Sequence, residues 1–118
     1  MANRNEIVFI EDILECIQKI QNYIKNITEA EFQNDSEKQG AIIRRIEIMG
    51  EATKKISSQT RKKYPNIPWK EMAGMRDVVI HEYFGISINL IWKVATKEIQ
   101  EIKPEIEKIL KDNDSGVS

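Results

Sequence analysis

The 118-residue chain concentrates its most reactive side chains in one short segment, residues 74–85. The segment holds the only histidine, His81, with Arg76 five residues before it and Tyr83 two residues after it. A histidine can transfer protons near neutral pH, and an arginine presents a rigid fork of donors to phosphate oxygens. A tyrosine can hydrogen-bond a phosphate or stack on a base. This set suits metal-free cleavage of RNA, whose 2′-hydroxyl is the nucleophile.

The spacing of these residues bears on how they can meet. On an ideal helix Arg76 and Tyr83 share a face, whereas His81 lies about 140° around the axis from Arg76. They can converge in a cleft near the helix end or between two subunits. Acid–base cleavage also needs two proton-transferring groups, and a symmetric dimer would supply the second histidine. We therefore expect a homodimer.

Other catalytic chemistries lack their residues. The sequence has no glycine-rich phosphate loop, no Cys/His ligand set and no nucleophile elbow, and one histidine cannot build a zinc site without carboxylates. We expect no metal and no cofactor. The single cysteine, Cys16, excludes an internal disulfide and fits a cytoplasmic protein. The apolar run Ile7–Ile10 is far too short for a signal peptide or a membrane span.

The formal net charge of −1 conceals a basic middle region. Residues 44–76 carry a net charge of +6, between flanks of −4 and −3. Such a region is either an anion-facing surface or a set of solvated helix faces. As an RNA-approach surface it would include the following basic residues: Arg44, Arg45, Lys54, Lys55 and residues 61–63.

Apolar residues recur every three or four positions, which predicts helices even though 21 isoleucines favour strands intrinsically. A long first helix continues to Ile27, with Asn3 or Asn5 as its cap. Thr28 and Glu31 form a capping box. Asp35-Ser36 starts a second long helix that extends to Ile56. In this second helix Gly50 suggests a close helix contact, and the candidates for the dimer face are Gly50 and the reactive segment of the third helix.

The second half of the chain contains further helix signals. Pro68 should be the first residue of a helical turn that Gly74 loosens, before a helix over residues 75–83. A fourth helix begins after Ser87 and kinks or restarts at Pro104. Residues 112–118 should fray. We predict one all-α domain over residues 1–118, an antiparallel bundle of four to five helices.

At the reactive segment the sequence resembles a known family. Arg76-x-x-x-x-His81-x-Tyr83 resembles the motif of the HepT-like family of HEPN domains. The flanking residues Ile67-Pro68-Trp69 and Ala73-Gly74-Met75 match the family as well, as does the stretch 44–52. The likeness covers about residues 6–111.

The resemblance implies a dimeric, metal-independent ribonuclease that is the toxin of a toxin–antitoxin pair. Arg76 and His81 match the catalytic pair. The antitoxin is a minimal nucleotidyltransferase that adds AMP to the motif tyrosine, here Tyr83. Asp77 stands where the family often has asparagine, and it can either orient Arg76 or repel phosphate.

Two other interpretations of the segment remain open. The chain can be a non-catalytic, nucleotide-binding or regulatory partner of a nucleotidyltransferase, with its motif as a docking surface. It can also be a plain structural bundle in which His81 caps the last carbonyls of its helix.

Overall fold

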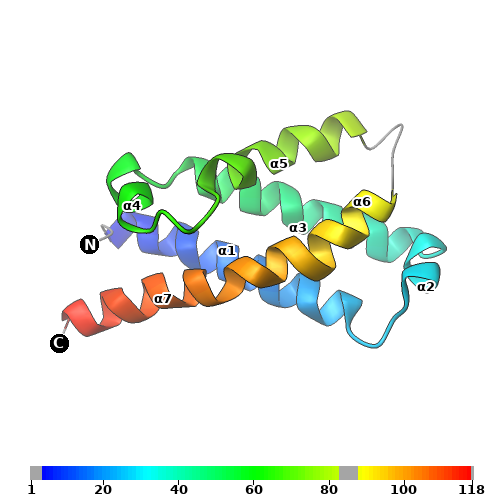
Figure 1. Ribbon diagram of the computed structural model, residues 1–118, viewed down its shortest axis with the longest axis horizontal. Helices are drawn as coiled ribbons and strands as arrows, with labels where there is room; N and C mark the ends of the chain where they lie inside the picture. The colour runs from blue at the N-terminus through cyan, green and yellow to red at the C-terminus, as the bar shows by residue number, and fades with distance from the viewer. Residues whose placement is uncertain (1–3, 83–87, 118) are drawn as a thin grey trace.

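The computed structural model describes residues 4–82 and 88–117, without the side chains of residues 4, 76, 78–82 and 114–117. The prediction of an all-α bundle is confirmed, and no strand occurs in these two ranges. The helices lie along the long axis of a molecule of 48 × 28 × 20 Å (Figure 1).

Four long helical runs form the bundle, and two short helices join them. The long runs are α1 (Arg4–Ile24), α3 (Ser36–Lys54), α5 (Trp69–Glu82) and the run of α6 (Ile88–Lys93), the π-helix η1 (Val94–Glu98) and α7 (Ile99–Val117). The short helices are α2 (Glu29–Gln33) and α4 (Ser58–Lys63).

The core is built mainly from isoleucines on the facing sides of these helices. α3 packs against both α1 and α5, and α7 packs against α1. Ile13, Ile46 and Ile106 are fully buried, and burying each such side chain contributes about 1.5–3 kcal/mol. We expected Gly50 at the dimer face, but it is buried within the subunit and therefore cannot belong to an exposed surface. No helix in the described ranges is long and apolar enough to cross a membrane.

The first connection follows its capping signals closely. α1 ends at Ile24, three residues earlier than predicted, because Asn26 adopts a left-handed conformation with φ of 63°. The capping box is confirmed, since the Glu31 amide donates to Thr28 Oγ1 at 3.1 Å and the Thr28 amide donates to Glu31 Oε1 at 2.9 Å. Asp35 caps α3 by accepting from the Lys38 amide at 3.0 Å.

The short helix α4 was not predicted, and it shortens α3 to Lys54. Ser57 caps α4 by accepting from the Thr60 amide at 3.2 Å. The buried carboxylate of Glu6 accepts hydrogen bonds from the Ser57 amide and, at 2.8 Å, from the Thr60 hydroxyl. This acid on α1 therefore satisfies donors at the start of α4 and ties the two helices together.

α5 is one continuous helix, so the expected loosening at Gly74 does not occur. Gly74 lies inside α5, and a Cβ atom there would meet nothing within 4 Å. Pro68 precedes the helix, because its carbonyl accepts the first helical bond from the Met72 amide at 3.0 Å. The predicted start at Pro68 is therefore one residue too early.

The C-terminal run changes pitch before Pro104 and remains helical through it. In η1 the Ile99 amide donates to the carbonyl of Val94, five residues earlier, and the Gln100 side chain donates to the Ala95 carbonyl at 3.1 Å. Pro104 lies inside α7 and is exposed, so water can hydrate the carbonyl that it leaves unpaired. The predicted restart at Pro104 is therefore wrong, whereas the predicted kink stays a prediction.

The end of α7 remains helical, and one hydrogen bond ties it to another part of the domain at Asp112. The helix continues from residue 112, where we expected fraying, to Val117. The Tyr64 hydroxyl donates to Asp112 Oδ2 at 2.9 Å, and the buried Asn113 side chain donates to the Ile109 carbonyl at 2.7 Å. The Tyr64 bond attaches α7 at Asp112 to the residue that ends α4, whereas the Asn113 bond lies within α7 itself.

The contact between Tyr64 and Asp112 makes stability sensitive to alkaline pH. Burial raises the pKa of Tyr64 from 10.0 to about 12, and the hydrogen bond to Asp112 and its negative charge add to the effect. The folded state thus favours the neutral phenol, whose contribution is complete below pH 10 and is lost as the pH rises towards about 12. We expect the free energy of unfolding to fall more steeply in this window for wild type than for Tyr64→Phe. Parallel urea-unfolding profiles would contradict this.

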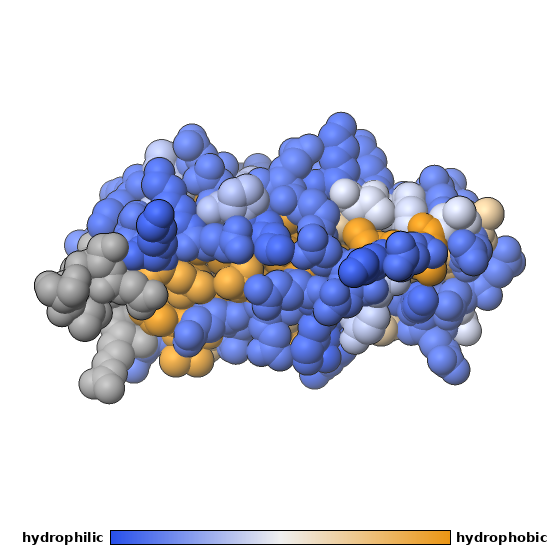
Figure 2. Space-filling model, turned by 90° about the horizontal axis from the view of Figure 1, so that it is seen from below, coloured by the Kyte–Doolittle hydropathy of each residue, from blue (hydrophilic) through white to orange (hydrophobic). Residues whose placement is uncertain are grey.

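The face formed by α1 and α7 carries a narrow hydrophobic strip along the long axis, interrupted by polar side chains (Figure 2). Both helices contribute half-buried apolar side chains, including Leu14 and Leu110. Val8 is the most exposed large hydrophobic residue in the described part, at 54%. The surface around the strip is hydrophilic.

Candidate functional site

Two of the candidate catalytic residues lie on one helix. Arg76 and His81 are both in α5, and the helix is unbroken between them. The two positions are five residues apart in sequence. On an ideal helix this spacing corresponds to about 7.5 Å along the axis and about 140° around it. Asp77 is exposed next to Arg76, whereas Tyr83 lies outside the described residues. The backbone thus presents Arg76 and His81 on different sides of a single element.

Two of the basic candidates lie alongside this part of α5. α3 and α5 pack against each other and run in opposite directions, so the last turns of α5 lie beside the first half of α3 (Figure 1). Arg44 and Arg45 belong to that half. Lys54 and Lys55 stand at the opposite end of α3, about 15 Å from Arg44 along the helix axis. The basic region therefore does not converge on the motif as a whole.

Several of these charges already have partners within the subunit. Arg44 lies 3.8 Å from Glu47, but its side chain is 68% exposed, so the pair leaves most of the guanidinium accessible. Lys54 lies 3.7 Å from Glu51. Lys55 is exposed at the end of α3.

Two arginines that we considered for RNA contact lie close to other parts of the fold. Burial raises the pKa of the Cys16 thiol, and the positive charge of nearby Arg45 only partly offsets this. Arg61 donates to the carbonyls of Thr53 at 2.8 Å and Ile56 at 3.1 Å, which satisfies the end of α3. Of the basic candidates on α3, Arg44 combines closeness to the motif half of α5 with exposure.

A contact between α2 and α6 fixes where the chain resumes after the motif. The rings of Phe32 and Trp92 pack with their centroids 5.2 Å apart, and the Gln33 amide donates to Asn89 Oδ1 at 2.6 Å. These residues lie about 60 positions apart in sequence, so no local pattern revealed the contact. α2 therefore braces the first turn of α6.

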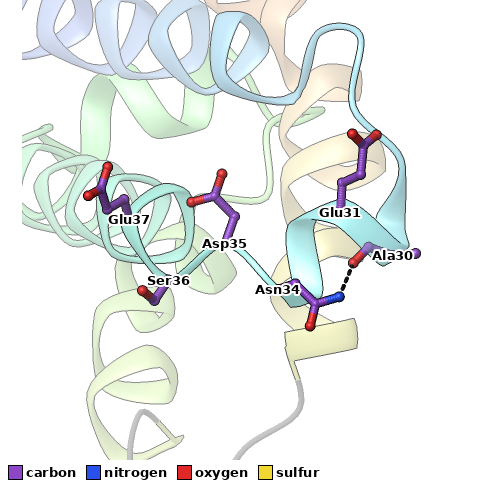
Figure 3. A pocket seen from close by; sticks show the side chains of 6 residues that line it. All are labelled: Ala30, Glu31, Asn34, Asp35, Ser36 and Glu37. Carbon is purple, nitrogen blue, oxygen red and sulfur yellow. Dashed lines mark hydrogen bonds between the residues drawn. The ribbon is translucent and has the colours of Figure 1, made fainter.

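The hollow at the junction of α2 and α3 does not suit an RNA phosphate. It has a volume of about 630 Å³, and Glu31, Asp35 and Glu37 line it (Figure 3). Glu31 and Asp35 are already occupied as helix caps, and Asn34 donates to the Ala30 carbonyl at 3.0 Å. No group of three or more metal-ligating side chains that could hold an ion occurs in the described part of the chain.

A second hollow is bordered mainly by basic side chains. It lies at the corner between α4 and α5, has a volume of about 650 Å³, and is bordered by Arg61, Lys62 and Lys70. Lys70 stands 11 residues before His81, which places this corner about 16 Å away from the motif histidine along α5. The corner can attract an anion, but not at the residues proposed for chemistry.

Comparison with known proteins identifies the family of this chain. The model of the HepT-like ribonuclease family matches residues 13–109. A Methanocaldococcus jannaschii protein named "Putative RNase MJ1216" is 48% identical over 112 residues, which cover 95% of this chain and 93% of that protein. The "Probable ribonuclease HepT" of Thermococcus cleftensis is 41% identical over 103 residues, with 87% and 94% covered.

A bacterial relative extends the comparison. The "Putative RNase TTE0752" of Caldanaerobacter subterraneus is 39% identical over 102 residues, which cover 86% of this chain and 91% of that protein. No solved structure matches the chain. The match to the family model covers both Arg76 and His81 and extends over most of the helical bundle, so the chain belongs to the HepT-like ribonuclease family.

Proposed function

We propose that this protein is a metal-independent RNA endonuclease whose working unit is a homodimer. The observation that carries the proposal is the placement of Arg76 and His81 on the unbroken helix α5 in a chain of the HepT-like ribonuclease family. Arg44, exposed on the neighbouring helix, is the basic residue that we assign to the RNA backbone near this site. Such a contact should make binding weaker as the salt concentration rises.

In the proposed reaction the RNA supplies its own nucleophile. A His81 imidazole removes the proton of the 2′-hydroxyl, the 2′-oxygen attacks the phosphorus, and the bond to the 5′-oxygen breaks. A protonated His81 gives a proton to that leaving oxygen, and a 2′,3′-cyclic phosphate remains. Arg76 stabilises the additional negative charge on the phosphate in the transition state.

The geometry of α5 favours a cleft shared between two subunits. One subunit supplies one histidine for two proton transfers, and the positions of Arg76 and His81 lie about 140° apart around the axis of an ideal helix. A second copy related by a twofold axis would place another Arg76 and His81 opposite the first pair. One imidazole then acts as the base and the other as the acid.

We further propose that the enzyme is the toxin of a toxin–antitoxin pair. Its antitoxin would be a minimal nucleotidyltransferase that attaches AMP to Tyr83. Tyr83 is two residues from His81, so the modification would add a bulky, negatively charged group beside the proton-transferring residue. That group would obstruct the cleft and repel an RNA phosphate.

The proposal is tested by supplying single-stranded RNA to the unmodified protein in excess EDTA. We expect cleavage that leaves 2′,3′-cyclic phosphate ends, and no cleavage of 2′-O-methyl RNA of the same sequence, because its 2′-oxygen cannot attack. The active species should have a mass of about twice 13.7 kDa by light scattering.

Each part of the proposal has an outcome that contradicts it. Loss of cleavage on chelation would show that a metal is needed. Cleavage of the 2′-O-methyl RNA would exclude the internal nucleophile. An absence of RNA turnover together with tight binding of a nucleotide or of the nucleotidyltransferase would favour a non-catalytic regulatory subunit. Full activity in a monomer would remove the shared cleft.

A further inference from the structure

Most basic side chains of the middle region gather at the end of the bundle that lies away from the motif. Residues 52–70 contain six lysines and arginines and no aspartate or glutamate. They form the end of α3, the whole of α4 and the start of α5, close to both chain termini (Figure 1). We call these six residues the basic end: Lys54, Lys55, Arg61, Lys62, Lys63 and Lys70.

The helix that carries half of the basic end is anchored to its neighbours. Arg61 donates to the carbonyls of Thr53 at 2.8 Å and Ile56 at 3.1 Å, which fixes α4 to the end of α3. On its other side α4 is held by the Thr60 hydroxyl, which donates to the buried carboxylate of Glu6 at 2.8 Å. The lysines of α4 therefore extend from a fixed element.

Two helices bring basic residues to the same hollow at this end. Lys62 from α4 and Lys70 from α5 border a hollow of about 650 Å³. Ser58 and Asn66 add a hydroxyl and an amide to its border, and Glu71 is the acidic residue among those that line it. Positive charge and neutral hydrogen-bonding groups thus meet at one place, which suits a phosphate group.

The charges of the basic end are largely available to a partner. Lys55, Lys62 and Lys70 are exposed, and none of the three forms an ion pair within 4 Å with a described carboxylate. Lys54 lies 3.7 Å from Glu51, but more than two-fifths of its side chain is exposed. A polyanion can therefore contact several of these charges without first displacing a partner.

The basic end and the motif are separate along the bundle. Lys70 stands 11 residues before His81 on α5, and the same number separates Arg44 from Lys55 along α3, so each pair is about 16 Å apart along its helix. The exposed Asp77 on α5 and two glutamates on α3 lie in this interval. An RNA that reaches from one region to the other would be held at two places and not along a continuous basic track.

From this arrangement we infer that the basic end is a second phosphate-binding site for the RNA that is cleaved at the motif. The substrate is then an RNA that extends at least about five stacked nucleotides beyond the cleaved bond, since each stacked nucleotide spans about 3.4 Å. The inference rests on the ribonuclease function proposed above for the motif. An RNA bound at the motif presents its further phosphates to the basic end at a high effective concentration, so the two contacts reinforce each other.

Other partners fit the basic end less well. A membrane surface would need apolar side chains to insert beside the charges, and all six residues of α4 are polar or charged. An acidic segment of another protein would satisfy the lysines, but nothing would connect it to the motif. An RNA reaches both regions with one repeating backbone charge.

The test measures binding of labelled 2′-O-methyl RNAs of 4, 8 and 16 nucleotides by fluorescence anisotropy, so that cleavage does not interfere. We expect affinity to rise at least about tenfold between the 4- and 16-nucleotide probes, because only the longer one reaches both regions. The combined variant Lys55→Gln, Lys62→Gln, Lys70→Gln should remove this rise. It should also reduce the slope of log affinity against log salt concentration by about 2, since each single-strand phosphate contact contributes about 0.7.

The matched control is Lys25→Gln, Lys97→Gln, Lys108→Gln, which removes the same charge from exposed positions outside the basic end. This variant should bind like wild type, and both triple variants should melt at the wild-type temperature. Equal weakening by the two triple variants would overturn the inference in favour of general charge attraction. Tighter binding of a polyglutamate peptide than of the 16-nucleotide probe would overturn it in favour of an acidic protein partner.

The inference and the proposed function fail in different ways. Metal-independent cleavage of unmodified RNA, together with equal affinity of wild type and both triple variants for the long probe, would overturn the second site and leave the ribonuclease in place. Loss of the length effect in the basic-end variant alone, with no cleavage of unmodified RNA by wild type, would support the basic end as an RNA site and overturn the ribonuclease.

Discussion

Replacing His81 with alanine should lower the rate of RNA cleavage by about 10²- to 10⁴-fold, the usual contribution of a positioned acid–base group. The loss should appear in kcat, because the imidazole acts in the chemical step while most RNA contacts remain. Arg76→Lys should also reduce kcat, since an ammonium group cannot reproduce the two-point contact of a guanidinium with a phosphate. Steady-state kinetics on a short labelled RNA in EDTA would measure both effects.

The controls for His81 distinguish catalysis from a structural role. Arg44→Gln should chiefly raise KM and flatten the salt dependence of binding, because we assign Arg44 to the RNA backbone. If His81 merely caps α5, its alanine variant would lower the melting temperature and retain the wild-type kcat. That result would remove His81 from the mechanism.

Replacing Phe32 with alanine should lower the free energy of unfolding by about 3–5 kcal/mol, as for other large buried aromatic residues. The Phe32 side chain is fully buried, and its ring contacts Trp92 on α6. α2 has only five residues, so its capping box cannot hold it in place without this anchor. The variant should therefore also release the first turn of α6, and urea unfolding with hydrogen exchange at α2 and α6 would measure both consequences.

Val8→Ala is a matched comparison for Phe32→Ala. Val8 is 54% exposed, so its truncation should change the free energy of unfolding by less than about 0.5 kcal/mol. If Phe32→Ala cost no more than Val8→Ala, α2 would not belong to the core, and its contact with α6 would not brace that helix.

Local signals predicted the helix starts well wherever a side chain hydrogen-bonds a backbone amide a few residues away. The capping box of Thr28 and Glu31 and the cap at Asp35 are examples, because each needs only residues three positions apart. Gly74 and Pro104 misled the prediction. Propensity disfavours both inside helices, but the surrounding turns remain helical, and packing outweighs a local cost of about 1 kcal/mol such as that of Gly74.

The sequence predicted which segment holds the candidate site, but it did not predict which side chains from other helices surround it. Arg76 and His81 do lie on one helix, as their spacing suggested. Net charge could not show that Arg61 donates to the backbone carbonyls of Thr53 and Ile56, because these contacts depend on how α4 packs against the end of α3. Glu71 and Glu98 line the same hollow although they come from segments about 30 residues apart, so their proximity could not be foreseen from spacing.

The single cysteine of this chain, Cys16, can report how often the helical bundle opens. Cys16 is 2% exposed on α1, and its raised pKa keeps it in the unreactive protonated form. A thiol-specific reagent can reach the sulfur only when the first helix separates from its neighbours. The labelling rate of the unaltered protein therefore measures how often the bundle opens, with no engineered probe.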